Sequence, residues 1–121
     1  MRKKILVIED NEQNLYLMTF LLGAHGFDVL EAKDGQIGIE VADQERPDLI
    51  LLDIQLPILD GYHVAKTLRQ NPKLNETPII AVTSYAMVGD KEEALASGCN
   101  GYIEKPINPD TFMDEIKLFL V

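Results

Sequence analysis

Short apolar runs alternate with segments of helical periodicity along the whole chain. The first run, Ile5–Ile8, is β-branched and apolar on both faces, which is typical of a buried parallel strand. Similar runs follow at Phe27–Ala32, Asp48–Asp53, Pro78–Val82 and Gly101–Glu104. The pattern predicts strands at these positions, with a longer connection between each strand and the next.

The connections carry helix signals. Asn11 is a favourable N-cap for a first helix that ends near Gly26, and Asn108 with Pro109 is expected to open the last helix. Further helices are predicted at Gly35–Glu45, from Gly61 onwards and at Asp90–Ser97. The segment Asn71–Thr77 is expected to be a polar loop. The periodicity turns towards the core Leu15, Met18, Leu22, Ile37, Val41, Val64, Leu68, Phe112, Ile116 and Phe119.

Strand and helix therefore follow one another five times, which predicts a parallel sheet with helices on both faces. Right-handed crossovers leave few topologies for such a chain. We expect the flavodoxin-like (βα)5 arrangement of the α/β class, a doubly wound parallel sheet of five strands in the order 2-1-3-4-5. Ligands of such sheets bind at the carboxyl ends of the strands, where the order reverses. We expect residues 1–121 to form one domain.

The composition is that of an ordinary soluble protein, with 46% hydrophobic and 26% charged residues. Lys and Arg total 11 against 20 Asp and Glu, a formal net charge of −9, which argues against non-specific nucleic-acid binding. The apolar run after the basic start Arg2-Lys3-Lys4 is too short for a secretory signal or a membrane span. The single cysteine, Cys99, excludes an internal disulfide, and a cytoplasmic protein is expected.

Polar side chains stand directly after four of the predicted strands. They are Glu9, Asp10, Asp53, Thr83, Glu104 and Lys105. Because the carboxyl ends of parallel strands meet at one edge of a sheet, we expect these groups to converge on one small site.

Three carboxylates that are close together repel one another unless a cation lies among them. Hard oxygen ligands suit Mg²⁺, which often binds together with phosphate groups, whereas Zn²⁺ prefers thiols and imidazoles. An aspartate such as Asp53 can attack phosphorus and form an acyl phosphate. The ammonium of Lys105 and the hydroxyl of Thr83 would then neutralise and bind phosphoryl oxygens. The pattern predicts a magnesium-dependent phosphoryl-transfer site.

Each residue also has a plain structural interpretation. Asp53 could be a turn former, Thr83 an ordinary turn hydroxyl and Lys105 a surface charge. Glu9 and Asp10 could simply favour the N-terminus of the first helix. The structural interpretation explains each residue separately, but it does not explain why all of them follow strands of the same predicted sheet.

These residues lie in stretches that resemble a response-regulator receiver domain, from about Lys3 to Val121. The resemblance rests on Ile8-Glu9-Asp10-Asn11, Leu52-Asp53-Ile54-Gln55-Leu56-Pro57 with Asp60-Gly61, Ala81-Val82-Thr83-Ser84, and Gly101-Tyr102-Ile103-Glu104-Lys105-Pro106. The stretch Thr83-Ser84-Tyr85-Ala86-Met87 with Gly89-Asp90 is similar to stand-alone cell-division regulators and to receivers of hybrid sensor kinases.

The resemblance implies a role for each site residue. Asp53 corresponds to the phosphoacceptor, and the Mg²⁺ ligands would be Asp10, Asp53 and the backbone carbonyl of Gln55, with Glu9 holding the ion through water. Thr83 corresponds to the switch hydroxyl, and Lys105 to the lysine that pairs with the phosphoryl group.

The resemblance also concerns the last strand and the residues after it. Tyr102 corresponds to an aromatic residue that turns inward when the protein switches, and its plain interpretation is a tyrosine half buried against the last helix. The Lys105-Pro106 peptide bond is expected to be cis.

The resemblance implies a phosphorelay switch and not a metabolic enzyme. Its donor would be a phosphohistidine on a histidine kinase or a histidine phosphotransfer protein, and a downstream effector protein would bind the face of the fourth helix, fifth strand and fifth helix. We expect no output domain in this chain, so the protein would act alone or as the receiver of a longer regulator or hybrid kinase. We expect a monomer or weak dimer, with no nucleic-acid or membrane partner.

Three other functions remain open at this stage. A flavin-binding electron carrier would have a loop rich in Ser, Thr and Gly after the first strand, where this chain has the acidic stretch Glu9-Asp10-Asn11-Glu12. A phosphohydrolase with an aspartyl nucleophile would have an acid where this chain has Gln55. A receiver that serves only as a docking module, independent of phosphorylation, is the third.

Overall fold

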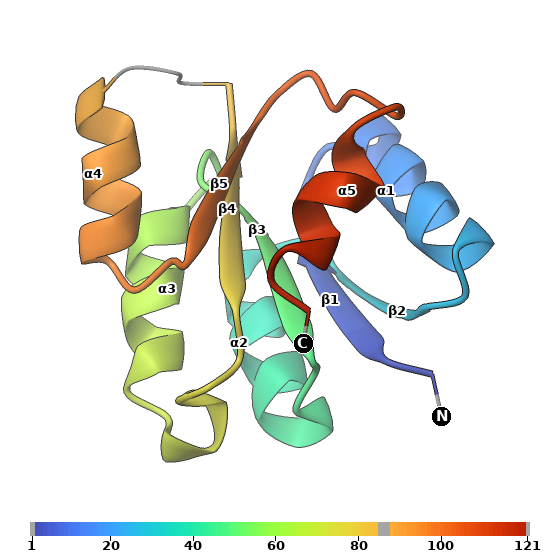
Figure 1. Cartoon of the computed structure of the whole chain (residues 1–121). Helices are drawn as coiled ribbons and strands as arrows, with labels where there is room; N and C mark the ends of the chain where they lie inside the picture. The colour runs from blue at the N-terminus through green and yellow to red at the C-terminus, as the bar shows by residue number, and fades with distance from the viewer. Residues whose placement is uncertain (1, 85–87, 121) are drawn as a thin grey trace.

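The computed structural model describes residues 2–84 and 88–120 (Figure 1). The strands are β1 (Lys4–Ile8), β2 (Asp28–Ala32), β3 (Leu49–Asp53), β4 (Ile79–Thr83) and β5 (Gly101–Glu104). The helices are α1 (Glu12–Ala24), α2 (Gly35–Glu45), α3 (Gly61–Arg69), the short 3-10 helix η1 (Pro72–Leu74), α4 (Val88–Ala96) and α5 (Phe112–Lys117). Residues 85–87, part of the stretch compared with the cell-division regulators, lie outside the described residues.

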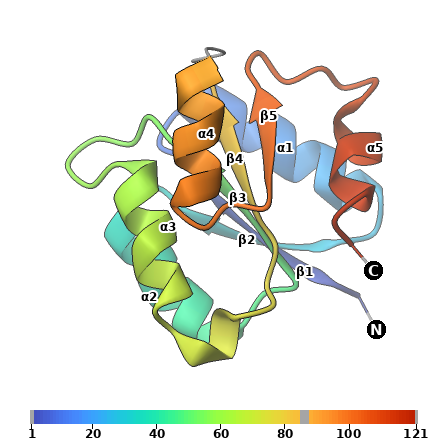
Figure 2. The same cartoon turned by 60° about the vertical axis from the view of Figure 1, so that its left-hand side comes forward.

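The strands form one parallel sheet in the order β2-β1-β3-β4-β5, so the predicted fold is confirmed. In Figures 1 and 2, α1 and α5 lie on one side of this sheet, and α2, α3 and α4 lie on the other. The order reverses between β1 and β3, which are hydrogen-bonded neighbours at the centre of the sheet. The loops after these two strands therefore lie next to each other.

The two halves of the core follow from the two-residue repeat of a strand. Ile5 and Val7 of β1 belong to the hydrophobic cluster with α1 and α5, whereas Leu6 and Ile8 belong to the cluster with α2, α3 and α4. Successive side chains point to opposite faces of a sheet, so a strand buried on both faces must be apolar throughout. This requirement explains the continuous apolar runs in the sequence.

Helix α2 departs from the expected orientation. Ile37, predicted to face the core, is 43% exposed, and Val41 is only half-buried. The buried positions of α2 are instead Gly35, Gly38 and Ala42. A Cβ atom on Gly38 would lie 2.5 Å from Ile8 Cδ1, so the helix packs too close to the sheet for a large residue at that position. The prediction from hydrophobic periodicity was wrong here, because the residues that face the core are small and not strongly hydrophobic.

Helix α5 also differs from the prediction, because it begins at Phe112 and not at Pro109. The side chain of Asn108 accepts a hydrogen bond from the Asp110 N–H at 3.0 Å and so stabilises a separate turn before the helix. The segment predicted to be a polar loop, residues 71–77, contains η1, and its Leu74 is fully buried. The other predicted elements and inward-facing residues are present, although Phe119 is only partly buried.

No helix in the described part of the chain is long and apolar enough to cross a membrane. Cys99 is a buried free thiol that packs in the cluster beneath α2, α3 and α4. His25 follows the end of α1 and its ring nitrogen Nδ1 lies 2.9 Å from the Leu21 carbonyl oxygen, so it caps the helix.

Gly61 and Gly23 should respond to alanine in opposite directions. A Cβ on Gly61 would lie 2.5 Å from Ile54 Cα and 2.6 Å from the Asp53 carbonyl oxygen, whereas nothing lies within 4 Å of a Cβ on Gly23. Gly61→Ala is expected to lower the free energy of unfolding by about 1–3 kcal/mol through overpacking. Gly23→Ala, in helix α1, is expected to raise it by up to about 1 kcal/mol. Urea unfolding followed by circular dichroism measures both, and an equal effect of the two variants would contradict the packing described for Gly61.

The Cys99 thiol should react slowly in the folded protein. Burial raises its pKa from 9.0 to about 11, against the opposing charge of Arg69. At pH 8 the thiolate, the reactive form, would be about 100-fold scarcer in the folded protein than in the unfolded chain. Alkylation by iodoacetamide is expected to be slower by at least that factor without urea than in it, and to accelerate as the pH rises towards 11. Glutathione in the same buffers controls for effects of urea on the reagent, and similar rates in both states would disprove the burial.

Candidate functional site

The predicted site residues meet at the carboxyl edge of the sheet. Glu9 follows β1, Asp53 ends β3, Thr83 ends β4 and Lys105 follows β5. The register pairs Ile8 with Leu52, Asp53 with Val82, and Thr83 with Glu104, so the strands end at the same level. The parallel order thus gathers residues that are far apart in the sequence.

A lysine bridges two buried carboxylates at this edge. The Lys105 Nζ atom lies 3.0 Å from Glu9 Oε1 and 3.2 Å from Asp53 Oδ1. Glu9 is fully buried and Asp53 is 2% exposed, while Asp10 is exposed at the rim. One carboxylate oxygen from each of Glu9, Asp10 and Asp53 lies within 4.8 Å of the others. The three predicted acids therefore form one cluster that opens to solvent on the side of Asp10.

Backbone donors orient the two buried carboxylates. The Asn11 N–H donates to Glu9 Oε2 at 3.2 Å, and the Gln55 N–H donates to Asp53 Oδ1 at 2.9 Å. Both bonds close short turns directly after a strand, and the one at Asp53 has a geometry that Asp and Asn side chains favour. The side chains are thereby held facing each other across the space between β1 and β3.

The cluster carries more negative charge than its lysine balances. Burial and the proximity of Asp53 raise the pKa of Glu9 to about 7, although Lys105 acts in the opposite direction. Burial also lowers the pKa of Lys105, but its interactions with Glu9 and Asp53 outweigh this effect and raise the pKa overall. Lys105 therefore remains charged, and the carboxylates still repel one another.

This donor set fits Mg²⁺. Among the described residues the cluster offers only oxygen atoms, the ligands that this ion prefers, and contains no thiol or imidazole. Glu9 Oε1 is buried and accepts no hydrogen bond from the described residues, although Lys105 is its ion-pair partner. A cation beside this oxygen and Asp53 would offset the burial of the Glu9 charge and its repulsion by Asp53, which together raise the pKa of Glu9.

The remaining predicted site residues are also at this edge. Thr83 is 1% exposed, and its carbonyl oxygen accepts a hydrogen bond from the Lys105 N–H at 2.8 Å. Tyr102 is half-buried as expected, and it packs against the cluster beneath α2, α3 and α4. The Lys105-Pro106 peptide bond is cis, as the resemblance to receiver domains implied.

One contact was not anticipated. The side-chain oxygen Oε1 of Gln55 accepts a hydrogen bond from the Ser84 N–H at 2.8 Å, which links the loop after β3 to the loop after β4. The sequence suggested a metal-binding role for the backbone carbonyl of Gln55 and a side chain that flanks the site and tunes the lifetime of the phosphoryl group, but it indicated no partner for that side chain. No local pattern indicates where a long, flexible amide side chain will find its partner.

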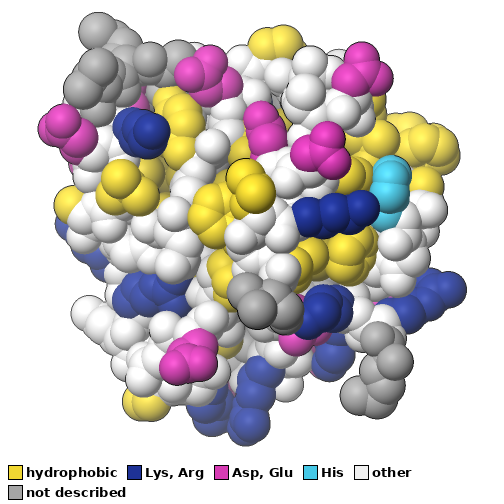
Figure 3. Space-filling model, viewed as in Figure 1, with side chains coloured by type: hydrophobic (Ala, Val, Ile, Leu, Met, Phe, Trp, Pro, Cys, Tyr) yellow, Lys and Arg dark blue, Asp and Glu magenta, His cyan; other side chains and the backbone are white. Residues whose placement is uncertain are grey.

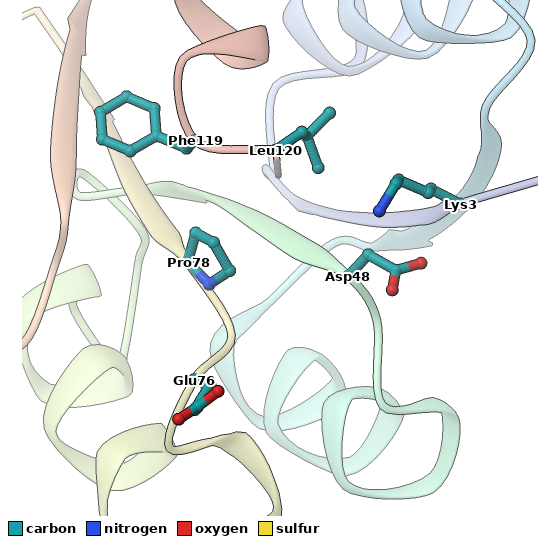
Figure 4. A pocket seen from close by; sticks show the side chains of 6 residues that line it. All are labelled: Lys3, Asp48, Glu76, Pro78, Phe119 and Leu120. Carbon is teal, nitrogen blue, oxygen red and sulfur yellow. The ribbon is translucent and has the colours of Figure 1, made fainter.

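Charged side chains are unevenly distributed over the surface (Figure 3), and a cavity lies at the edge of the sheet opposite the site. In the view of Figure 3, acidic side chains gather mostly in the upper half, and Lys and Arg mostly in the lower half. A cavity of about 290 Å³ lies at the opposite, amino edge of the sheet, lined by Lys3, Asp48, Glu76, Pro78, Phe119 and Leu120 (Figure 4). None of these residues belongs to the carboxylate cluster, so the cavity is separate from the site.

Comparisons with known proteins agree with this architecture. The family model described as "Response regulator receiver domain" matches residues 5–117. The polar-differentiation response regulator DivK of Brucella anthropi is 42% identical over 120 residues, which cover 99% of this chain and 98% of that protein.

Solved structures of receiver domains are similar too. The receiver domain of a sensor histidine kinase from Pseudomonas aeruginosa, with a magnesium ion coordinated in its active-site cleft, has 32% identity and a TM-score of 0.91 over 99% of this chain and 98% of that one. A chain in the complex of the Saccharomyces cerevisiae histidine phosphotransfer protein Ypd1 with the receiver domain of Ssk1 has 31% identity and a TM-score of 0.90 over 98% of this chain and 89% of that one. The fold, the sequence match and the strand-end residues lead to one conclusion: the chain belongs to the response regulator receiver domain family.

Proposed function

We propose that the receiver domain, taken as residues 1–121, accepts a phosphoryl group on Asp53 and so works as a phosphorelay switch. The observation that carries this proposal is the contact of the Lys105 ammonium with both Glu9 and Asp53. It brings a nucleophilic carboxylate, a cation and further oxygen ligands into one small site at the edge of the sheet. Phosphoryl transfer depends on this kind of positioning and charge neutralisation.

The reaction is a displacement at phosphorus. A carboxylate oxygen of Asp53 attacks the phosphorus of a phosphohistidine, a P–O bond forms, and the P–N bond breaks with its electron pair passing to the imidazole nitrogen. The imidazole then takes a proton from solvent. Slow attack of water on the acyl phosphate returns the Asp53 carboxylate and releases inorganic phosphate. The protein catalyses only these steps on itself.

Each residue around Asp53 has its own role in the transfer. Glu9, Asp10, Asp53 and the backbone carbonyl of Gln55 would hold Mg²⁺, which supplies positive charge to the transferring group. The Lys105 ammonium neutralises a phosphoryl oxygen, and the Thr83 hydroxyl donates a hydrogen bond to another. Tyr102, half-buried on the outer strand β5, would change position with Thr83. The added charge biases these residues towards a second arrangement.

The partners follow from the chemistry. The donor is a histidine kinase or a histidine phosphotransfer protein, an inference supported by the similarity to the chain solved with Ypd1. A downstream effector would bind the surface formed by α4, β5 and α5. We place this monomer or weak dimer in the cytoplasm, in keeping with the free thiol of Cys99, and assign it no nucleic-acid or membrane partner.

The buried carboxylates also bear on the competing functions. Glu9 and Asp53 would repel the phosphate of a flavin that arrived without a metal ion, which disfavours the electron carrier. The side chain of Gln55 is engaged with the Ser84 backbone and supplies no acid for a phosphohydrolase. A docking module that needs no phosphorylation, or the receiver of a longer regulator or hybrid kinase, would share this architecture, and the first of these is an outcome of the test below.

Asp53→Asn is expected to abolish phosphorylation, because an amide cannot replace the attacking carboxylate. Wild type incubated with acetyl phosphate and Mg²⁺ should gain the mass of one phosphoryl group, measured on the intact protein by mass spectrometry. The gain should disappear in Asp53→Asn and in wild type treated with EDTA. Asp48→Asn, at the opposite edge of the sheet, is the matched control and should be phosphorylated like wild type. No gain in wild type would favour the docking module.

Lys105→Met is expected to strengthen the binding of Mg²⁺ and to slow phosphoryl transfer. Removing the ammonium that contacts Glu9 and Asp53 leaves the acids with less compensation, so Mg²⁺ should bind about tenfold more tightly. The rate of phosphorylation by acetyl phosphate should fall by about 100-fold or more, because a donor to the transferring group is lost. Calorimetric titration with Mg²⁺ and timed mass spectrometry measure the two effects. Weaker binding of Mg²⁺ would mean that the lysine supports the metal site and does not compete with it.

A further inference from the structure

Gln55 contacts both the acceptor and the loop after β4. Its backbone N–H donates to Asp53 Oδ1 at 2.9 Å, and its side-chain Oε1 accepts from the Ser84 N–H at 2.8 Å. A backbone N–H is only a donor, so the amide atom that faces Ser84 must be the oxygen. One residue therefore joins the nucleophilic carboxylate to a segment 29 positions further along the chain.

The peptide unit between Thr83 and Ser84 is held at both of its polar ends. Its carbonyl accepts from the Lys105 N–H at 2.8 Å, and its N–H donates to Gln55. The bond to Lys105 joins two backbone groups, so it needs no particular side chain. The bond to Gln55 needs a side-chain acceptor of this length at this position. Gln55 thus supplies a contribution to holding the Thr83–Ser84 peptide that depends on the side chain at position 55.

We infer that Gln55 is a positioning residue that stabilises the unphosphorylated arrangement of the Thr83–Ser84 peptide and so opposes the switch. This inference rests on the proposed function, in which the hydroxyl of buried Thr83 moves towards the phosphoryl group. In this inference Thr83 moves together with the peptide that follows it, and turning that peptide weakens the bond from Ser84 to Gln55.

Formation of the acyl phosphate also affects Gln55, through the hydrogen bond that its backbone N–H donates to Asp53. The bond from the Gln55 N–H to Asp53 Oδ1 is strengthened by the negative charge of the carboxylate. Phosphorylation moves that charge from the aspartate to the phosphoryl oxygens, which weakens this bond. Phosphorylation therefore weakens the hydrogen bond of the Gln55 backbone, and the movement of Ser84 weakens the hydrogen bond of the Gln55 side chain. Each of these two changes favours the other.

The test is the affinity for the beryllium trifluoride anion, which bonds to a carboxylate oxygen in place of a phosphoryl group. Titrations followed by ¹⁹F NMR at saturating Mg²⁺ remove any difference in metal affinity. Gln55→Leu lacks the acceptor and is expected to bind the anion about 2- to 10-fold more tightly than wild type, the size expected for one hydrogen bond lost from the resting state. Gln55→Glu keeps an acceptor oxygen and should not bind more tightly. Gln44→Leu, an exposed change on α2, controls for the general effect of the substitution.

The hydrogen bond from the Ser84 N–H to Gln55 can also be tested directly, without any phosphoryl mimic. Hydrogen exchange of the Ser84 amide, followed by NMR, should be faster in Gln55→Leu than in wild type and Gln55→Glu. Unchanged exchange, or equal or weaker anion binding by Gln55→Leu, would overturn the inference while leaving the proposed function intact. Failure of wild type itself to bind the anion would overturn both.

Discussion

The site depends on one ammonium group placed between two buried carboxylates. Lys105 reaches Glu9 and Asp53 at ion-pair distance, and without it both acids would lie uncompensated at the end of an apolar sheet. Removing one partner of a buried ion pair is costly, because the remaining charge is left without solvent. A single ammonium does not balance the acids of the cluster, and the pKa of Glu9 is raised by its burial and by the proximity of Asp53. The lysine thus compensates the buried acids enough for the protein to fold, and the negative charge that remains still attracts a cation.

Much of this arrangement could be predicted because it follows from periodicity and chain order. The apolar strands, the parallel sheet and the convergence of Glu9, Asp53, Thr83 and Lys105 all result from polar residues that follow buried strands. Helix α2 could not be oriented in the same way, because Gly38 and Ala42 carry too little apolar surface to mark an inner face. Their burial reflects how closely the helix approaches Ile8, a tertiary property.

The start of α5 and the link from Gln55 to Ser84 were missed for a different reason. Asn108 and Pro109 form a favourable helix opening, but Asn108 instead stabilises a turn of its own, and both outcomes satisfy the same local preferences. The partner of Gln55 lies in another loop, so its position depends on the finished sheet. Local sequence determines which groups need hydrogen bonds, whereas the tertiary fold determines which partners are within reach.

The alternation of β1 between two hydrophobic clusters has a consequence for how such a protein can diversify. Ile5 and Val7 serve the layer of α1 and α5, and Leu6 and Ile8 serve the layer of α2, α3 and α4. A substitution in one layer is separated from the other by the backbone of the sheet, and changes without shared neighbours tend to be additive. Each layer can therefore accumulate mutations with little epistasis from the other. One helical surface is free to acquire new partners while the opposite surface keeps its own.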